Sequence, residues 1–178
     1  MVQFNGVATG EVDNPNACSF RWTGMAHIEC VNPDGSIAWV EDIKNANTTA
    51  GINSMIGVYF NSVTQITTWY IGLVANSGFS SFAVADTMGS HTGWTEDTNY
   101  SESVRQTWGS LSVSGGAISG ATLTFTMNGT TTIYGIFVTS SSTKSGTSGT
   151  LWGTAPFSST QSVVSGQTLR VTYSGTMA

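Results

Sequence analysis

The chain has 178 residues, of which 8% are charged and 39% hydrophobic, and its formal net charge is −5. This length suits a single domain that encloses its own core, and the acidic balance argues against nucleic acid as a direct partner, because phosphate contacts need clustered Lys and Arg. Ordinary soluble domains are about 25% charged, so this Gly-, Ser- and Thr-rich composition predicts β-strands with tight turns and an exterior partly covered by other subunits.

Charge also divides the chain. All ten acidic residues precede Val104, and residues 104–178 carry only Arg105, Lys144 and Arg170. We infer that the two halves face different neighbours.

The first residues, MVQF, lack the basic start and apolar run of a secretory signal. No stretch approaches the roughly 18 apolar residues of a membrane span. We therefore expect no membrane partner, and assembly from the cytoplasm in which the chain is made.

Residues 1–17 contain Gly, Asn and Pro and show no sustained hydrophobic period. They predict a flexible N-terminal arm ahead of one domain at 18–178. Residues 19–31 then alternate, with four members on one face: Phe20, Trp22, Ile28 and Cys30. NPDG at 32–35 is a turn, because Pro presets φ and Gly accepts positive φ. The partner strand returns at 36–43, which predicts a hairpin.

Cys18 and Cys30 lie about 40 Å apart if residues 18–31 form one strand, at ~3.3 Å per residue. A disulfide needs a Cα separation of about 5.5 Å. A break at Gly24 could fold the segment back, so the sequence leaves their pairing open.

The stretch NANTTAGINSMIGVYFN carries the pattern of an amphipathic helix. Thr48 or Thr49 can serve as its N-cap. Its apolar residues recur at i, i+3, i+4 and i+7 and form one stripe: Ile52, Met55, Ile56 and Tyr59. Gly51 and Gly57 lower its helix propensity. The pattern predicts one short helix at about residues 48–59.

The remaining sequence predicts strands. ITTWYIGLVA at 66–75 is a nearly continuous apolar run, typical of a central strand buried on both faces. Further short, mostly alternating segments are 103–108, 110–114, 117–127, 131–139, 150–157 and 167–174. Gly, Ser and Asn separate them, including the SSSTKSGTSG run at 140–149. Short strands at about 8–12-residue spacing predict an all-β fold, a β-sandwich or jelly roll.

Neither histidine, His27 or His91, has partners at metal-ligand spacing, since HxH, HExxH and CxxC motifs are absent. His27 lies in an alternating strand and should face outward or find a partner in the core. No GxSxG elbow, GxGxxG loop or Walker loop occurs. We expect neither a metal nor a cofactor.

The loop DTMGSHTGWTEDTNY at 86–100 gathers the residue types most often found in active sites. Glu96 and Asp97 could supply the two carboxylates of a glycosidase, but adjacent residues project in different directions and make a poor facing pair. We favour a structural interpretation, in which Asp86 caps a helical turn over 85–91. In it Gly93 reverses the chain, Trp94 and Tyr100 anchor the loop, and Glu96, Asp97 and Asn99 face solvent or a neighbour.

Arg105 follows this loop. Its planar guanidinium can hold a carboxylate with two hydrogen bonds. We expect an ion pair with Glu96 or Glu102.

Residues 64–108, TQITTWYIGLVANSGFSSFAVADTMGSHTGWTEDTNYSESVRQTW, resemble the central signature of a family of tailed-bacteriophage virion proteins. In that family a segment like IECVNPDGSIAWVEDIKNANTTAGINSMI precedes a TTWYIGL-type strand. An ADTM-x-SH-x-GW-x-E-x-x-x-Y loop and S-x-x-x-R-x-x-W follow. YGIFVTSSSTKSGTSGTLWGTAPF and the terminal GQTLRVTYSGT match as well, so the resemblance covers roughly residues 20–176.

The resemblance implies a non-enzymatic, β-rich component of the particle, of the kind that cements or decorates the head. It carries over motif positions with an interface or structural role and assigns none to catalysis: Trp69, Asp86, His91, Trp94, Glu96, Tyr100, Arg105 and Trp108. Our leading hypothesis is a capsid cement or decoration protein on the capsid exterior of the virion. It would form a homo-oligomer, a dimer or trimer, and bind between major capsid proteins.

Two alternatives stay open. A tail, baseplate or host-surface-binding component would be present in few copies per particle. A carbohydrate-binding or glycan-hydrolysing protein on a jelly roll would lose that activity when Glu96 or Trp94 is changed.

Overall fold

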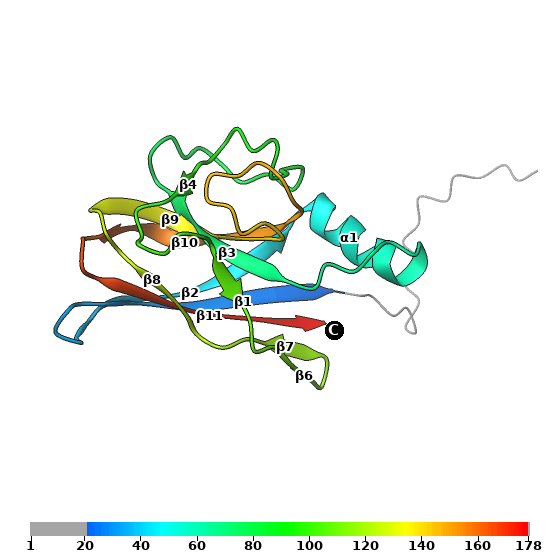
Figure 1. Cartoon of the computed structure of the whole chain (residues 1–178), viewed down its shortest axis with the longest axis horizontal. Coiled ribbons are helices and arrows are strands. Elements are labelled where there is room, and N and C mark those ends of the chain that lie inside the picture. The colour runs from blue at the N-terminus through cyan, green and yellow to red at the C-terminus, as the bar shows by residue number, and fades with distance from the viewer. Residues whose placement is uncertain (1–20, 178) are drawn as a thin grey trace, which may run out of the picture.

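One antiparallel sheet forms most of the protein and curls around its core (Figure 1). The structure, a computed structural model, describes residues 21–177, so the predicted arm at 1–17 lies outside the described residues. The predicted all-β fold with one short helix is confirmed. In chain order the elements are β1 (Trp22–Val31), β2 (Ile37–Asn47), α1 (Thr49–Phe60), β3 (Trp69–Ala75), β4 (Glu96–Asp97), β5 (Gln106–Trp108), β6 (Ser112–Ser114), β7 (Ala117–Ser119), β8 (Leu123–Thr126), β9 (Thr131–Thr139), β10 (Leu151–Val163) and β11 (Thr168–Met177).

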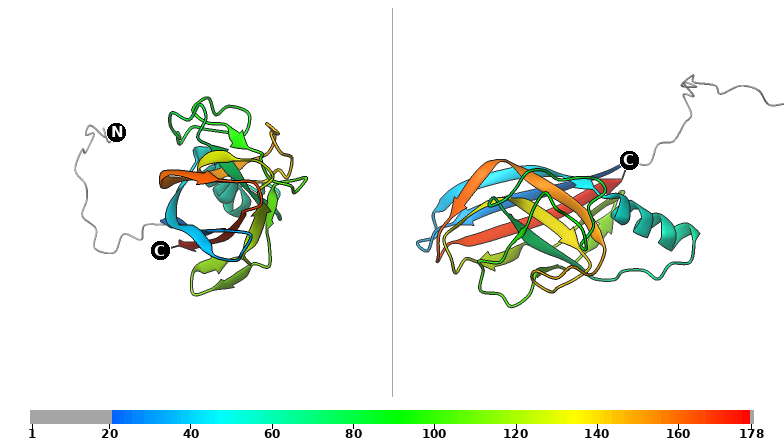
Figure 2. Two further views of the ribbon diagram at one scale, coloured as in Figure 1. Left: turned by 90° about the vertical axis from the view of Figure 1, so that its left-hand side faces the viewer. Right: turned by 90° about the horizontal axis from the view of Figure 1, so that it is seen from above.

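The strands follow the order β4-β3-β9-β10-β2-β1-β11-β7-β6, with β5 paired to β3 and β8 paired to β11. A ladder of two residue pairs joins β2 to β10. The strands on either side of this junction face each other, and the end-on view shows the sheet curling round (Figure 2). On the opposite side, a bridge between Tyr100 and Met127 ties the chain after β4 to the end of β8. The core is therefore enclosed as between the layers of a sandwich.

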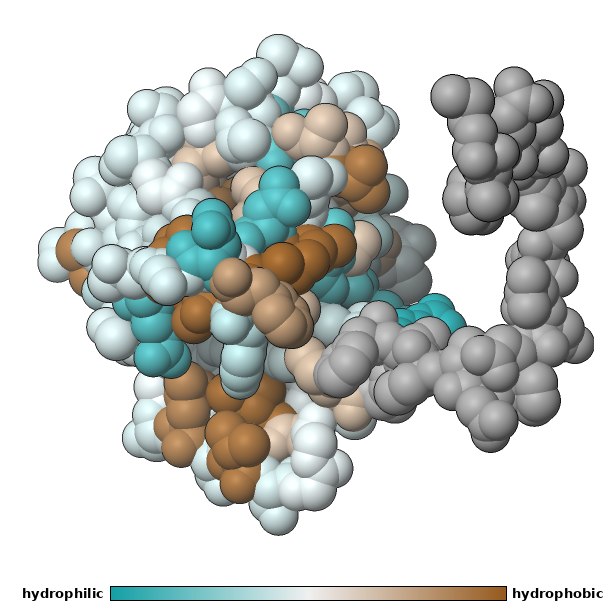
Figure 3. Space-filling model, turned by 90° about the vertical axis from the view of Figure 1, so that its right-hand side faces the viewer, coloured by the Kyte–Doolittle hydropathy of each residue, from teal (hydrophilic) through white to brown (hydrophobic). Residues whose placement is uncertain are grey.

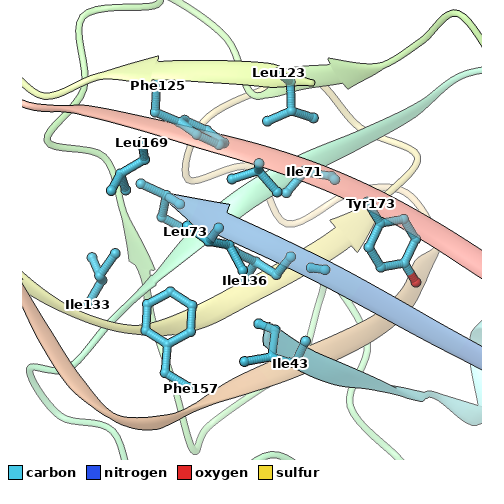
Figure 4. Packing of buried hydrophobic residues seen from close by; sticks show 14 of the residues in the cluster. Ile43, Ile71, Leu73, Leu123, Phe125, Ile133, Ile136, Phe157, Leu169 and Tyr173 are labelled. Carbon is cyan, nitrogen blue, oxygen red and sulfur yellow. The ribbon is translucent and has the colours of Figure 1, made fainter. Parts of the chain in front are cut away.

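Apolar side chains from both layers fill the interior (Figure 4). Successive side chains of a strand point to opposite faces, so alternate residues of β1 and β11 point inward. Six of them are at most 1% exposed: Ala26, Ile28, Cys30, Leu169, Val171 and Tyr173. β3 and β9 supply facing residues, namely Ile71, Leu73, Ile133 and Ile136.

The predicted hairpin of β1 and β2 is confirmed. Gly35 has a φ of +86°, and its backbone N–H donates to the carbonyl oxygen of Asn32 at 2.9 Å. β1 runs unbroken through Gly24, so the alternative in which the chain folds back at this residue is wrong. A Cβ at Gly24 would lie 2.4 Å from the hydroxyl of Tyr173, which explains why glycine stands at this close approach. The question of a bond to Cys18 lies outside the described residues.

β3 is buried on both faces over residues 71–74, as the apolar run predicts. Ile71 and Leu73 belong to the main core. Val74 belongs to a second cluster, beneath the loop that joins β3 to β4.

The helix begins where the sequence predicts, but its apolar stripe faces outward. Thr48 Oγ1 accepts a hydrogen bond from the N–H of Gly51 at 3.1 Å and caps α1. Gly51 is the buried contact, since a Cβ there would lie 2.5 Å from the carbonyl oxygen of Trp152 on β10. Of the stripe, Met55 packs against the core, whereas three members are 41%, 47% and 80% exposed: Ile52, Ile56 and Tyr59.

Candidate functional site

The loop between β3 and β4 forms the second hydrophobic cluster. Trp94 is its largest fully buried side chain, at 1% exposure. Its ring lies 5.9 Å from that of Phe82 and 5.1 Å from that of Phe137, and His91 stacks on it at 4.0 Å. The prediction that Trp94 anchors the loop is confirmed. Further buried members are Val74, Met88 and Leu151.

Asp86 holds the indole of Trp94 and does not cap a helix. Its Oδ2 accepts hydrogen bonds from Trp94 Nε1 and from the backbone N–H three residues before it, both at 2.9 Å. The predicted helical turn over 85–91 is wrong, because Thr87 and Ser90 pair through their backbones in a tight turn. An N-cap side chain accepts a hydrogen bond from the backbone N–H two or three residues later in the chain. The Asp86 carboxylate instead accepts from the N–H of Ala83, three residues earlier, and from the indole of Trp94.

Glu96 and Arg105 form a nearly buried ion pair. Arg105 Nε donates to Glu96 Oε1 at 2.9 Å, and Nη2 donates to Oε2 at 2.8 Å. The side chains of Arg105 and Glu96 are 1% and 6% exposed. Of the two partners predicted for Arg105, Glu96 is therefore the one found. Glu102 instead accepts from the backbone N–H of Thr126.

The SSSTKSGTSG segment closes over this ion pair. Arg105 Nη1 donates to the carbonyl of Ser141 at 3.0 Å, and Nη2 donates to that of Gly146 at 3.1 Å. The backbone N–H of Ser145 donates to Glu96 Oε2 at 2.6 Å. Nothing in the Ser- and Gly-rich pattern predicts this docking. One ion pair thus fastens two loops that are distant in the sequence.

Lys144 makes a second tie between the same loops. Its Nζ donates to the carbonyl oxygen of Tyr100 at 2.7 Å and lies 3.6 Å from the centroid of the Tyr100 ring. Desolvation lowers the pKa of Lys144, although nearby carboxylates including Glu102 act in the opposite direction. Tyr100 itself is 1% exposed and packs edge-on against Phe125, so the prediction that it anchors the loop is confirmed.

Asp97 is 3% exposed. It accepts hydrogen bonds from Thr131 Oγ1 at 2.6 Å and from the backbone N–H of Asn99 at 2.8 Å. The prediction that Glu96 and Asp97 face solvent or a neighbour is wrong, because β4 pairs with β3 and places both among donors from later segments. Asn99 is exposed, as expected.

A cavity of about 240 Å³ opens beside these groups, with His91, Trp94, Glu96 and Arg105 in its wall. Both oxygens of Glu96 and all three guanidinium nitrogens of Arg105 already have protein partners. Acid–base chemistry at Glu96 would have to break a buried ion pair. Within residues 21–177, no three His, Cys, Asp or Glu side chains are grouped so that they could hold a metal ion. The arrangement is suited to holding loops together.

Trp69 and Trp108 lie apart from this loop cluster, as register partners on β3 and β5. Trp108 Nε1 donates to the carbonyl of Tyr173 at 3.0 Å. Trp69 packs against Trp152, with ring centroids 5.7 Å apart, and Trp152 packs against Trp22 at 5.3 Å. Sequence reasoning missed Trp22 and Trp152 as members of this group, because only the topology shows that β1 and β10 both flank β2.

Of the two placements expected for His27, the outward one is found, because its side chain on β1 is 46% exposed. Its Nδ1 lies 2.8 Å from Asp42 Oδ1, and its Nε2 lies 3.6 Å from Glu29 Oε1. The hydrogen bond with Asp42 raises the pKa of His27, and desolvation offsets part of that rise.

Comparison with protein-family models gives no match, and no curated protein matches the chain. No helix in the part of the chain that the structure describes is long and apolar enough to cross a membrane. The resemblance to phage virion proteins stays a prediction.

Proposed function

We propose that the chain is a structural protein of a tailed-bacteriophage virion, a cement or decoration protein that binds between major capsid proteins on the outside of the head. It acts as a homo-oligomer, without catalysis and without a cofactor. The resemblance carried by residues 64–108 motivates the proposal. The geometry supports it through what the motif residues do in this fold.

The observation that carries the proposal is that the charged side chains of the loops bind one another and the loop backbone inside the domain. Asp86, Glu96, Asp97 and Arg105 are charged residues of the motif region, and each is at least partly buried and held by hydrogen bonds within the domain. Fixed, cross-tied loops suit a protein that must keep its shape under mechanical load. They also leave few charges outside, and interface cores are depleted in charged residues.

The geometry gives the glycan alternative little support at this loop. Trp94 is 1% exposed, so its ring has no open face for a sugar. Glu96 is occupied by Arg105 and the N–H of Ser145. A substrate would therefore meet neither a platform nor a carboxylate that is ready to transfer a proton.

Electron microscopy of the intact particle, together with a count of copies relative to the major capsid protein, tests the proposal. We expect density for this domain at contacts between major capsid proteins, in numbers comparable to the capsid subunits. Density on the tail with few copies would favour the tail or baseplate alternative. A particle that lacks the protein altogether would overturn the proposal.

A second test uses particles produced without this protein, to which the purified full chain is added back. We expect binding to saturate at the copy number of the intact particle and to raise the temperature at which the heads release DNA. Binding without saturation, or saturation without stabilisation, would contradict a cement role.

A further inference from the structure

The outward face of α1 is apolar, although a surface helix ordinarily turns its apolar stripe to the core. Tyr59 and Phe60 are 80% and 87% exposed, and Ile52 and Ile56 are 41% and 47% exposed. These four residues lie on one side of the helix, at i, i+4, i+7 and i+8. Val63, just after the helix, is 47% exposed. The helix contacts β10 through Gly51, which lies on another side of the helix, so the sheet does not cover this stripe.

An aromatic groove continues this face toward β6 and β7. Two adjoining cavities of about 160 and 200 Å³ share four wall residues: Gln65, Ile66, Trp69 and Trp152. Tyr59 lines the first cavity, and Leu111 lines the second. Beyond the groove, Val113 on β6 is 74% exposed. Hydrophobic side chains gather at the surface of this end of the molecule (Figure 3).

We call the exposed apolar residues of this end, together with the groove, the α1 face: Ile52, Ile56, Tyr59, Phe60, Val63, Ile66, Trp69, Leu111, Val113 and Trp152. The chain segments that build it carry almost no charge. Neither residues 45–85 nor residues 106–143 contain any Asp, Glu, Lys, Arg or His. Arg21, exposed beside Trp22, stands at its rim.

The low charge of the α1 face favours a second copy of this chain as its binding partner. A two-fold contact places the same surface on both sides, so an uncharged apolar surface can pack against its own copy without bringing like charges together. In a chain of net charge −5, a face without acids lets two copies meet without burying unpaired carboxylates. A membrane is a poorer occupant, because helices that lie on membranes carry Lys and Arg on their polar side, and α1 has none.

The two exposed aromatic residues supply a substantial part of the area that a dimer needs. A large aromatic side chain presents ~150–250 Å², so Tyr59 and Phe60 together offer on the order of 300 Å². A stable interface takes about 800 Å² from each partner. The half-exposed aliphatic residues and the walls of the groove can make up the difference. Aromatic residues are also the ones enriched where binding energy concentrates.

We propose that two copies of this chain associate through their α1 faces about a two-fold axis, with Tyr59 and Phe60 of each copy packed against the other. The inference rests on this face alone. If the proposed function is right, the α1 face is the surface through which the homo-oligomer forms.

Light scattering and sedimentation of the purified full chain, at concentrations from nanomolar to high micromolar, test this association. We expect a species of twice the chain mass of 18.7 kDa that dissociates on dilution. Tyr59→Ser/Phe60→Ser should weaken the dimer by at least about a hundred-fold, because both residues would leave the centre of the contact. Ile37→Ser/Val40→Ser is the matched control: it removes two residues that are 55% and 46% exposed on β2, and the dimer should persist.

Thermal denaturation followed by circular dichroism checks that the variants are folded. Both double variants change exposed side chains, so they should melt at the same temperature as the unmodified chain. Leu111→Ser/Val113→Ser, across the groove, should also weaken the dimer. Hydrogen exchange should show slower exchange on dimerisation at residues 49–68 and 111–118. A monomer throughout the concentration range, a dimer insensitive to both α1-face variants, or protection confined to residues 1–20 would each overturn the inference.

This test separates the inference from the proposed function. A dimer through the α1 face whose chain is absent from phage particles would leave the inference standing and overturn the function. A monomer that nevertheless decorates the head would do the reverse.

Discussion

The guanidinium of Arg105 meets the carboxylate of Glu96 at two points, 2.9 and 2.8 Å, with both side chains almost wholly withdrawn from solvent. The same two side chains also bond to the backbone of Ser141, Ser145 and Gly146, so the pair holds the segment after β3 against the loop between β9 and β10. A buried pair of this kind is costly to break from one side, because the remaining charge has no water to solvate it.

Arg105→Met should therefore lower the free energy of unfolding by about 3–5 kcal/mol. Urea denaturation followed by circular dichroism measures the loss. Arg105→Met/Glu96→Leu, which removes both charges, should recover at least half of it. A single variant within about 1 kcal/mol of the unmodified chain would show that the ion pair contributes little.

Asp86→Ala should cost about 1–3 kcal/mol, because it leaves the indole N–H of buried Trp94 without an acceptor. Asp86→Asn keeps an oxygen in the same place and should cost less than half as much. Tryptophan fluorescence during denaturation reports the change. Equal losses for Ala and Asn would mean that the negative charge matters more than the acceptor.

Two glycines of α1 give a paired prediction about helix docking. Gly51→Ala should destabilise the protein by about 1–3 kcal/mol, since the new Cβ would meet the Trp152 backbone at 2.5 Å. Gly57→Ala would meet only the side chain of Val63, at 3.0 Å. It should be neutral or stabilising by up to about 1 kcal/mol through helix propensity. Thermal denaturation of both variants measures the contrast, and a stabilising Gly51→Ala would contradict the docking geometry.

The contrast in α1 illustrates what the sequence could and could not specify. The capping threonine and the apolar spacing predict the helix and its start, because both are local properties. Which side of the helix meets the sheet depends on the position of Trp152, more than ninety residues later in the chain. The stripe pattern alone therefore suggests burial of the wrong side.

The candidate site shows the same limit. Trp94 and Tyr100 are large and apolar, so their burial follows from composition. The ion pair of Glu96 with Arg105 is close in sequence and could be predicted. The other partners, Ser145 for Glu96 and Thr131 on β9 for Asp97, are 49 and 34 residues away and are brought near by the pairing of β3 with β9. Local reasoning sees two adjacent acids and assigns them to the surface. The strand order needed to correct this is not encoded in any short motif.

His27 should titrate with a pKa above its ordinary value of 6.5, because Asp42 accepts a hydrogen bond from its ring. Its stabilising effect is then fully present below pH 6.5 and is lost as the pH rises through the pKa of the folded state. Nuclear magnetic resonance of the imidazole protons gives the value directly. Asp42→Asn should lower it, with Glu29 and Arg170 left in place as the other charges nearby. No change in that variant would refute the assigned cause.

Cys30 should resist thiol reagents in the folded protein. It is fully buried on β1, and desolvation raises the pKa of its thiol to about 11, so little thiolate is present at pH 8. In a Cys18→Ser background, labelling with a coloured disulfide reagent should be negligible until denaturant is added, and then rise to one thiol per chain. Rapid labelling without denaturant would show that β1 opens readily.

β1 is flanked by β2, its immediate successor, and by β11, the last strand described. During translation, the β1–β2 hairpin has one unpaired edge on β1 until β11 is synthesised. An unpaired strand edge can pair with another chain. The domain can close only after β11 has been synthesised. When many copies are made at once, each chain therefore exposes this edge of β1 to its neighbours until its own β11 has paired with it.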